Sequence, residues 1–285
     1  MSDTSVRAAI AAAEKVGALP TVVERALAAI YDSRSDAREL AGIIGLDPAL
    51  TGKILKLVNS PYYNTLPRRV VSLTEAILRL GYRTVQSALL TTEIASQLRP
   101  ALPHYGLQRK QFWHHCVAVA LCAREVARRS RLGHAEEAYV AGLLHDIGKV
   151  GMDRAYAATS DVRRLVRERK LPYHEAEMIE LRVDHATVGE LVANRWGLPP
   201  ATGEAIGAHH RLESKPGALV ATVSTANALG WMLGFPGTDD KVPREVDDYA
   251  LASLRMRSGE VEKLAVALLP VVVDALGLLS SDDEP

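Results

Sequence analysis

The sequence has few cysteines, few phenylalanines and no net charge. The 285 residues include two cysteines and two phenylalanines, and 34 basic side chains balance 34 acidic ones. Cys116 and Cys122 fall in one predicted helix at a spacing that places them on different sides, so we expect two buried thiols and no local disulfide. The zero net charge gives no reason to expect a polyanionic partner.

Long apolar stretches are also absent. No run reaches the roughly 18 uncharged residues that a membrane-spanning helix needs. The longest, residues 264–279, is interrupted by Pro270 and Asp274. The N-terminus is polar and amphipathic and lacks the features of a signal peptide. These absences predict a cytoplasmic protein with no membrane segment.

Charge is unevenly distributed along the chain. Residues 51–131 contain 13 basic and 3 acidic side chains, whereas residues 213–285 contain 6 basic and 12 acidic ones. A basic half can contact nucleic acid, a nucleotide or an acidic partner. A solvated surface is the more common explanation, and it is the one we favour.

Helical periodicity runs through nearly the whole chain, which predicts an all-α fold. We expect a multi-helix bundle preceded by a smaller N-terminal helical subdomain. The stretch PALPHYG, residues 100–106, is the strongest break near the middle. The predicted division is therefore an N-terminal subdomain over 1–100, a bundle over 105–235, C-terminal helices over 236–280 and a disordered tail over 281–285.

Helix-capping signals support this assignment. Asp47 before Pro48 is typical of an N-cap followed by proline at the first helical position. Ser72 and Glu75 form the pattern of a capping box. We also expect Ser35 to cap the helix that ends at Gly45.

The segment AYVAGLLHDIGKV, residues 138–150, runs from an apolar helix directly into His145 and Asp146. A neutral imidazole and a carboxylate are good ligands for a divalent metal, and both can reach one ion at a helix end. Gly148 is expected to let the chain leave the helix. Lys149 then lies where it could meet an anionic group.

Further potential ligands recur along the second half of the chain, on four predicted helices flanked by apolar residues. Helix bundles build metal sites in this way, from side chains on facing helices. The candidate metal ligands are His115, His145, Asp146, His185, His209 and His210.

Several segments together resemble a known superfamily. WHHC (113–116), GLLHDIGK (142–149), VDHATVGELVANRWGLP (183–199) and AHH (208–210) are similar to the HD superfamily of metal-dependent phosphohydrolases. In the first half, LPTVVERALAAI, ARELAGIIGLDPALTGKILKLVNSPYY and SLTEAILRLGYRTVQSALL resemble the HDOD family, the HD-related output domain. The resemblance covers roughly residues 18–235 and implies that the multi-helix bundle is of the HD type.

The resemblance implies that the six candidate ligands hold one or two divalent ions, of iron, manganese, zinc or magnesium. In HD enzymes such an ion polarises a phosphate and activates water, which would make Asp146 and Lys149 the catalytic residues. Asn227 stands where these enzymes have a closing carboxylate, and an amide is a poorer ligand. Gln111 stands where dinuclear HD-GYP proteins have a glutamate. The HD-GYP signature after His209-His210 is also missing, so the sequence does not predict cyclic-di-GMP hydrolysis.

Three functions are compatible with these features. The first is a signalling or regulatory protein that binds a partner protein or a small phosphorylated or nucleotide ligand, and we favour it. The second is a metal-dependent phosphohydrolase in which Lys149 and Arg124 hold phosphate.

The third function is DNA binding through residues 36–59, which have the pattern of a helix-turn-helix with Thr51, Lys53, Lys56 and Asn59 on the second helix. The apolar residues of that helix leave little of it free to enter a groove, so we do not expect DNA as a partner. The sequence does not determine the oligomeric state.

Overall fold

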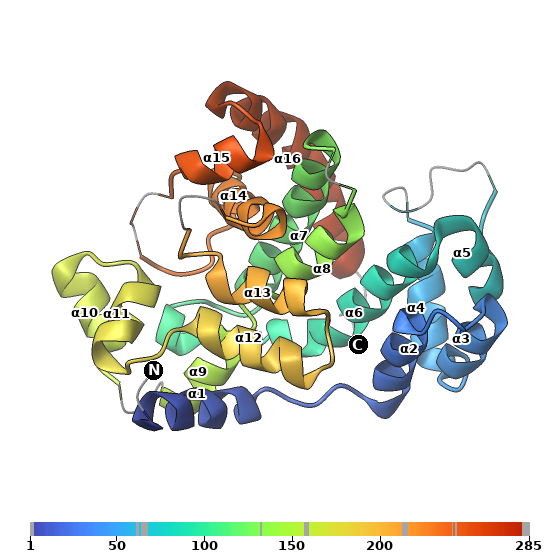
Figure 1. The fold of residues 1–285 in the computed structure, drawn as a ribbon, viewed down its shortest axis with the longest axis horizontal. Helices are drawn as coiled ribbons and strands as arrows, with labels where there is room; N and C mark the ends of the chain where they lie inside the picture. The colour runs from blue at the N-terminus through green and yellow to red at the C-terminus, as the bar shows by residue number, and fades with distance from the viewer. Residues whose placement is uncertain are drawn as a thin grey trace. The chain divides into compact units, whose positions relative to one another are not determined.

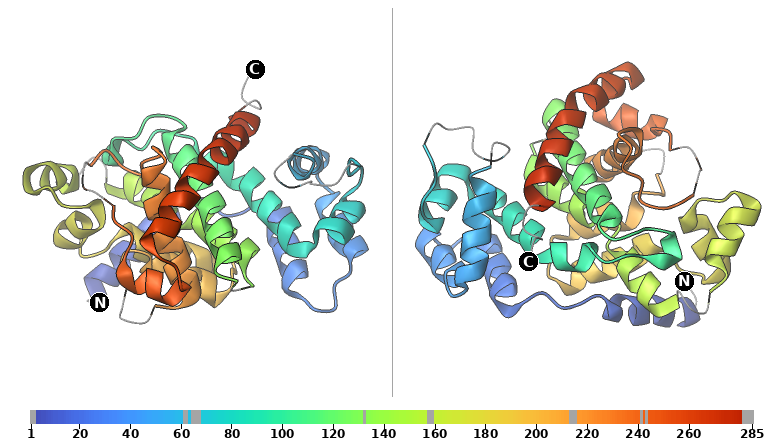
Figure 2. Two further views of the ribbon diagram at one scale, coloured as in Figure 1. Left: turned by 90° about the horizontal axis from the view of Figure 1, so that it is seen from above. Right: turned by 180° about the vertical axis from the view of Figure 1, so that it is seen from behind.

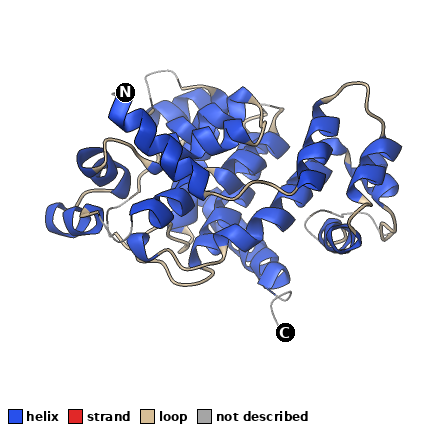
Figure 3. Ribbon diagram, turned by 90° about the horizontal axis from the view of Figure 1, so that it is seen from below, coloured by secondary structure: helices blue, strands red, loops and turns tan. Residues whose placement is uncertain are grey.

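The computed structural model contains only helices and loops in the part of the chain that it describes (Figure 3). Its backbone pairing there is limited to an isolated bridge between Leu102 and Leu107. The all-α prediction is confirmed. The predicted tail, 281–285, lies outside the described residues. The described residues are 3–60, 63, 68–131, 133–156, 160–212, 216–240, 242 and 244–280.

Contacts divide the chain into two compact units. Unit 1 combines Met1–Gly17 with Ser96–Val272, and unit 2 combines Ala18–Ala95 with Val273–Pro285. The predicted boundary near residue 100 falls close to Ser96, although the first helix packs within unit 1. The division into domains stays a prediction.

Unit 1 contains most of the helices (Figure 1). They are α1 (Asp3–Lys15), η1 (Pro103–Tyr105), α7 (Gln111–Arg129), α8 (Ala135–Leu144), α9 (Gly148–Tyr156), α10 (Val162–Arg169), α11 (Tyr173–Glu180), α12 (His185–Arg195), α13 (Pro200–Ala208), α14 (Ala218–Met232) and α15 (Asp248–Leu254). Unit 2 contains α2 (Thr21–Tyr31), α3 (Ala37–Ile44), α4 (Pro48–Val58) and α5 (Leu73–Leu80). Two helices cross the division, α6 (Tyr82–Leu98) and α16 (Ser258–Ser280).

Helix α7 is the centre of unit 1. It packs against both α8 and α14, and nearly every residue from Phe112 to Ala127 is buried. Small and branched side chains such as Ala123, Val126 and Ala226 fill the core that these helices share with α13, α15 and α16. Because phenylalanine is scarce, the helices approach each other through alanine, valine and leucine.

On another side of unit 1, α1, α9 and α12 pack against one another, and Figure 2 shows them from behind in blue, yellow-green and gold. Gly148 permits this packing, because a Cβ there would lie 1.9 Å from the carbonyl oxygen of His185. The predicted role of Gly148, to end the preceding helix, is wrong. Helix α8 already ends at Leu144, and Gly148 begins α9, a helix that the sequence pattern did not predict.

Capping residues fix the starts of α3, α4 and α5 in unit 2 and of α12 in unit 1. Asp47 and Ser72 cap α4 and α5, as predicted, by accepting from the backbone N–H groups of Leu50 and Glu75. The prediction for α3 is wrong by one residue, since Asp36 and not Ser35 accepts its first N–H groups. In unit 1, Asp184 caps α12.

Helices α3 and α4 form the predicted helix-turn-helix segment. Ile54 and Val58 are buried, and Lys53 and Lys56 are exposed. The Asn59 amide donates to the carbonyl oxygens of Leu55 and Val70, both at 2.7 Å, and accepts from Val70 N–H. The Asn59 side chain, one of the four that the helix-turn-helix pattern offers, is therefore engaged with backbone.

Among the described residues, none of the helices combines the length and the apolar character needed to cross a bilayer.

Candidate metal centre

Four helices of unit 1 deliver the six candidate ligands to one place. His115 lies in the second turn of α7, and His145 and Asp146 directly follow α8. His185 is the first residue of α12, positioned by the Asp184 cap. His209 and His210 follow α13. All except His210 are buried.

The ligand atoms form two groups that share Asp146. In one group, Nε2 of His115 and Nε2 of His145 both lie 3.3 Å from Asp146 Oδ2. In the other, Nε2 of His185 and Nε2 of His209 lie 3.2 and 3.6 Å from Asp146 Oδ1, and His210 completes the set. The carboxylate therefore bridges two clusters, each of which has the residue types of a divalent-metal site.

The donor atoms of the first group fit a cation. Nδ1 of His115 faces the carbonyl oxygen of Phe235 at 2.7 Å, and Nδ1 of His145 faces that of Gly142 at 2.9 Å. A carbonyl oxygen only accepts, so each Nδ1 carries the proton and each Nε2 presents a lone pair. The two Nε2 atoms are only 3.2 Å apart. Two lone pairs at that distance repel, and a positive ion between them removes the repulsion.

A buried carboxylate orients His185. Glu177 Oε2 accepts from Nδ1 of His185 at 2.7 Å and from its backbone N–H at 2.8 Å. The other carboxylate oxygen accepts from the Tyr105 hydroxyl at 2.6 Å. A metal-binding histidine commonly has its second nitrogen fixed in this way. Glu177, on α11, is therefore part of the centre although it does not reach the ligand atoms.

Burial and nearby charges shift the pKa values of these side chains in opposite directions. Burial lowers the pKa of His209 to about 4, which keeps its imidazole neutral and able to bind metal. Burial alone would lower the pKa of His185, but the carboxylates of Glu177 and Asp146 raise it to about 9. Burial would raise the pKa of Asp146, yet His145 and Lys149 hold it well below its usual value. Asp146 is therefore a carboxylate at neutral pH.

The segment after α14 covers the first group. Lys149 donates to Asp146 Oδ2 at 2.5 Å and to the carbonyl oxygen of Gly237 at 3.1 Å. A Cβ on Gly237 would lie 2.6 Å from Nε2 of His115. Asp239 holds this segment in place by accepting from Tyr173 and Arg163, both at 2.7 Å. This face of the centre is thus closed by backbone.

Arg124, Gln111 and Asn227, which the sequence analysis also discussed, are not among the ligand groups. Arg124, predicted as a phosphate-binding residue, is paired with Glu136 at 2.6 Å and stacks on Tyr139. Gln111 accepts from the backbone N–H of Gln108 near the start of α7. Asn227 lines a pocket beside His209 and His210.

Sequence reasoning missed Glu177, Tyr105 and Gly237. A signal for Glu177 was present, because Tyr173, Ala176 and Glu177 share the buried face of α11 and a carboxylate is unexpected there. Gly237 lies in a loop whose position over the centre has no sequence signature.

Comparison with known proteins agrees with this geometry. The HDOD domain matches residues 16–212. A crystal structure of an HDOD domain protein of unknown function from Geobacter sulfurreducens superimposes with a TM-score of 0.74 at 27% identity, covering 97% of each chain. A protein from Shewanella amazonensis SB2B, described as a candidate phosphohydrolase, shares the fold with a TM-score of 0.73 at 20% identity, over 95% of this chain and 98% of that one.

An uncharacterized protein of Treponema pallidum (strain Nichols) is 27% identical over 252 residues, which is 85% of this chain and 48% of that protein. The chain thus spans about half the length of this curated relative.

An all-helical bundle that gathers five histidines and one aspartate defines a protein with a candidate divalent-metal centre. Within that class, this chain belongs to the HDOD family.

Proposed function

We propose that this chain is a signalling protein whose helical bundle binds a divalent metal and passes a signal through a bound ligand or partner. The observation that carries the metal site is the pair of facing Nε2 atoms of His115 and His145, 3.2 Å apart beside a fully buried carboxylate. The HDOD resemblance supports the signalling role, because proteins of that family are regarded mainly as signalling outputs.

The composition of the centre favours particular metals. Five imidazoles and one carboxylate form a nitrogen-rich set. Imidazole suits iron and zinc, whereas magnesium prefers oxygen ligands and water. Of the metals that the resemblance implies, iron and zinc therefore fit best.

Metal-dependent phosphohydrolysis is the second candidate function, and the pocket beside His209 and His210 favours it. A divalent ion at this centre would polarise a phosphate oxygen and lower the pKa of water. Lys149 holds Asp146 in place, and Asn227 and Arg244 line the pocket in which a phosphorylated ligand would lie. Asn227 supplies no negative charge, so the centre would hold metal less tightly than one closed by a carboxylate.

Elemental analysis of protein purified without chelating tags tests the first proposal. We expect one or two equivalents of a divalent metal per chain. The Asp146→Ala variant, which removes a ligand from both groups, should lose it. His114→Ala, which changes the α7 histidine next to His115 and outside both groups, should retain it. A folded wild-type protein without metal would contradict the proposal.

Turnover needs a separate assay. The metal-loaded protein is incubated with phosphomonoesters and phosphodiesters, and phosphate release is compared with that of Asp146→Ala. Release by the wild-type protein alone would establish the second candidate, while metal binding without release would favour a purely regulatory role.

A further inference from the structure

A small pocket adjoins the second ligand group, on the side of the centre that the loop around Gly237 does not cover. Its volume is about 180 Å³, and its walls include His209, His210, Ser224, Asn227, Arg244 and Glu245. This volume is below the roughly 300 Å³ at which pockets for drug-sized ligands begin. The enclosed part of the pocket therefore suits a group smaller than a nucleotide.

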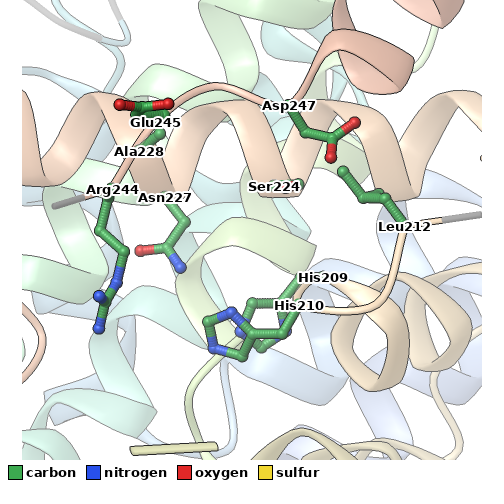
Figure 4. Close-up of a pocket in the computed structure, with 9 residues that line it drawn as sticks. All are labelled: His209, His210, Leu212, Ser224, Asn227, Ala228, Arg244, Glu245 and Asp247. Carbon is green, nitrogen blue, oxygen red and sulfur yellow. The ribbon is translucent and has the colours of Figure 1, made fainter. Parts of the chain in front are cut away.

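Asn227 provides an unused hydrogen-bond acceptor inside this pocket. The residue is 7% exposed, and among the described residues no donor reaches its Oδ1. Figure 4 shows the amide pointing into the space above the two histidines. An unpaired buried carbonyl is unfavourable, so a donor from a bound molecule would stabilise the site.

The charged side chains of the pocket are unevenly placed, with carboxylates on the wall opposite the candidate metal ligands. Arg244 is fixed by Asp240 at 2.8 Å and stacks on Trp231. Figure 4 shows Glu245 and Asp247 on the wall opposite His209 and His210. With a cation on the histidines, one end of the pocket attracts an anion and the other attracts hydrogen-bond donors.

From these features we infer that the pocket binds a small phosphomonoester whose organic end carries hydroxyl or ammonium donors. The inference rests on the proposed metal site. The phosphoryl group lies toward His209 and His210, and the donors face Asn227 Oδ1 and Glu245. A second phosphate at the organic end would meet the carboxylates of Glu245 and Asp247, which excludes bisphosphates and dinucleotides as preferred ligands.

Calorimetric titration of the Mn²⁺-loaded full chain tests this inference with two matched probes. One is 3,4-dihydroxybutylphosphonate, whose carbon–phosphorus bond resists hydrolysis, and the other is butylphosphonate, which has the same chain without donors. We expect the dihydroxy compound to bind at least about tenfold more tightly, because a site built around a hydrogen bond rejects the analogue that lacks it. Equal affinities would overturn the inference.

Variants locate the donor contacts. Asn227→Ala and Glu245→Ala should each remove most of the preference for the dihydroxy compound while the Mn²⁺ affinity stays unchanged. Glu262→Ala, which removes an exposed carboxylate on α16, should leave the preference intact. If Asn227→Ala weakens Mn²⁺ binding instead, Asn227 is a metal ligand and the inference is wrong.

A separate Mn²⁺ titration distinguishes failure of the pocket inference from failure of the proposed metal site. Mn²⁺ binding without a preference between the probes would overturn the pocket inference alone. Absence of Mn²⁺ binding would overturn the proposed metal site and the inference together.

Discussion

Gly237 limits the space around the candidate metal centre at a single position. A methyl group there would lie 2.6 Å from Nε2 of His115 and 3.1 Å from Asp146 Oδ2. Both side chains are fully buried and cannot easily move away. We expect Gly237→Ala to weaken divalent-metal binding by about tenfold or more, in the range measured when groups that orient a metal site are removed.

Equilibrium titration with Zn²⁺ or Mn²⁺ gives the affinity for this comparison, and circular dichroism shows whether the helices persist. Gly259→Ala is the matched control, because a Cβ at Gly259 meets nothing within 4 Å. Unchanged affinity in Gly237→Ala would show that the centre has more room than its geometry indicates.

Cys122 titrates differently in the folded and unfolded chain. Burial raises its pKa from 9.0 to about 12. Above pH 9 the unfolded thiol loses its proton while the folded one keeps it, so stability falls as pH rises through this window. Between pH 8 and 10.5 the wild-type protein should lose about 2 kcal/mol more stability than Cys122→Ala.

Urea unfolding of the two proteins at both pH values measures this difference. In the native state at pH 8 the Cys122 thiol should also resist Ellman's reagent and react after denaturation. Rapid reaction of the native thiol would contradict its burial.

At the residue scale, the sequence indicated the candidate ligands that the structure brings together and missed the groups that position them. His145 and Asp146 stand out because an ionisable pair interrupts an apolar helix. Glu177 and Gly237 act through contacts across 8 and 122 residues of chain, with His185 and His115 respectively. Such contacts depend on tertiary packing, which a local pattern does not encode.

Helix α11 contributes a buried carboxylate, Glu177, to the centre. Replacing this carboxylate removes the acceptor for Nδ1 of His185 and leaves the Tyr105 hydroxyl without its partner. We expect Glu177→Ala to reduce metal affinity by about 10–100-fold. Glu177→Gln should lose less, because its amide oxygen can still accept from His185.

The control for this prediction is Glu180→Ala, which changes an exposed carboxylate on the same helix. The absorption of Co²⁺-substituted protein reports the ligand geometry directly. A spectrum and affinity that are identical in Glu177→Ala and Glu180→Ala would show that Glu177 does not orient His185.

At the element scale, capping signals predicted where α4 and α5 begin and placed the cap of α3 one residue early. Helix α9 was missed because its two glycines, Gly148 and Gly151, resemble chain breaks. Both instead allow close approach, Gly148 to α12 and Gly151 to the backbone of α1, where a Cβ would lie 2.3 Å from the oxygen of Ala12. A glycine needed for packing and a glycine needed for a turn look the same in a sequence.

In the whole molecule, every candidate ligand belongs to unit 1 and none to unit 2. A ligand that binds only the folded state stabilises it, by about 2.7 kcal/mol at a concentration 100 times Kd. We therefore expect scanning calorimetry to show two transitions. Divalent metal should raise the melting temperature of only one of them. The chelator EDTA should reverse the shift.

Assignment of that transition to unit 1 follows from Asp146→Ala, which removes a ligand from both groups and should abolish the metal-induced shift while leaving the other transition in place. A single transition that metal raises would mean that the two units unfold together. No shift in either would contradict metal binding.

The sharing of Asp146 between two ligand groups also has a consequence for how metal binding can be lost in evolution. Each histidine serves one group, so the loss of one leaves the other group complete. Asp146 gives one carboxylate oxygen to each group, so one codon change there removes a ligand from both. A lineage with this bundle can therefore pass from a metal-binding to a metal-free form in a single mutational step.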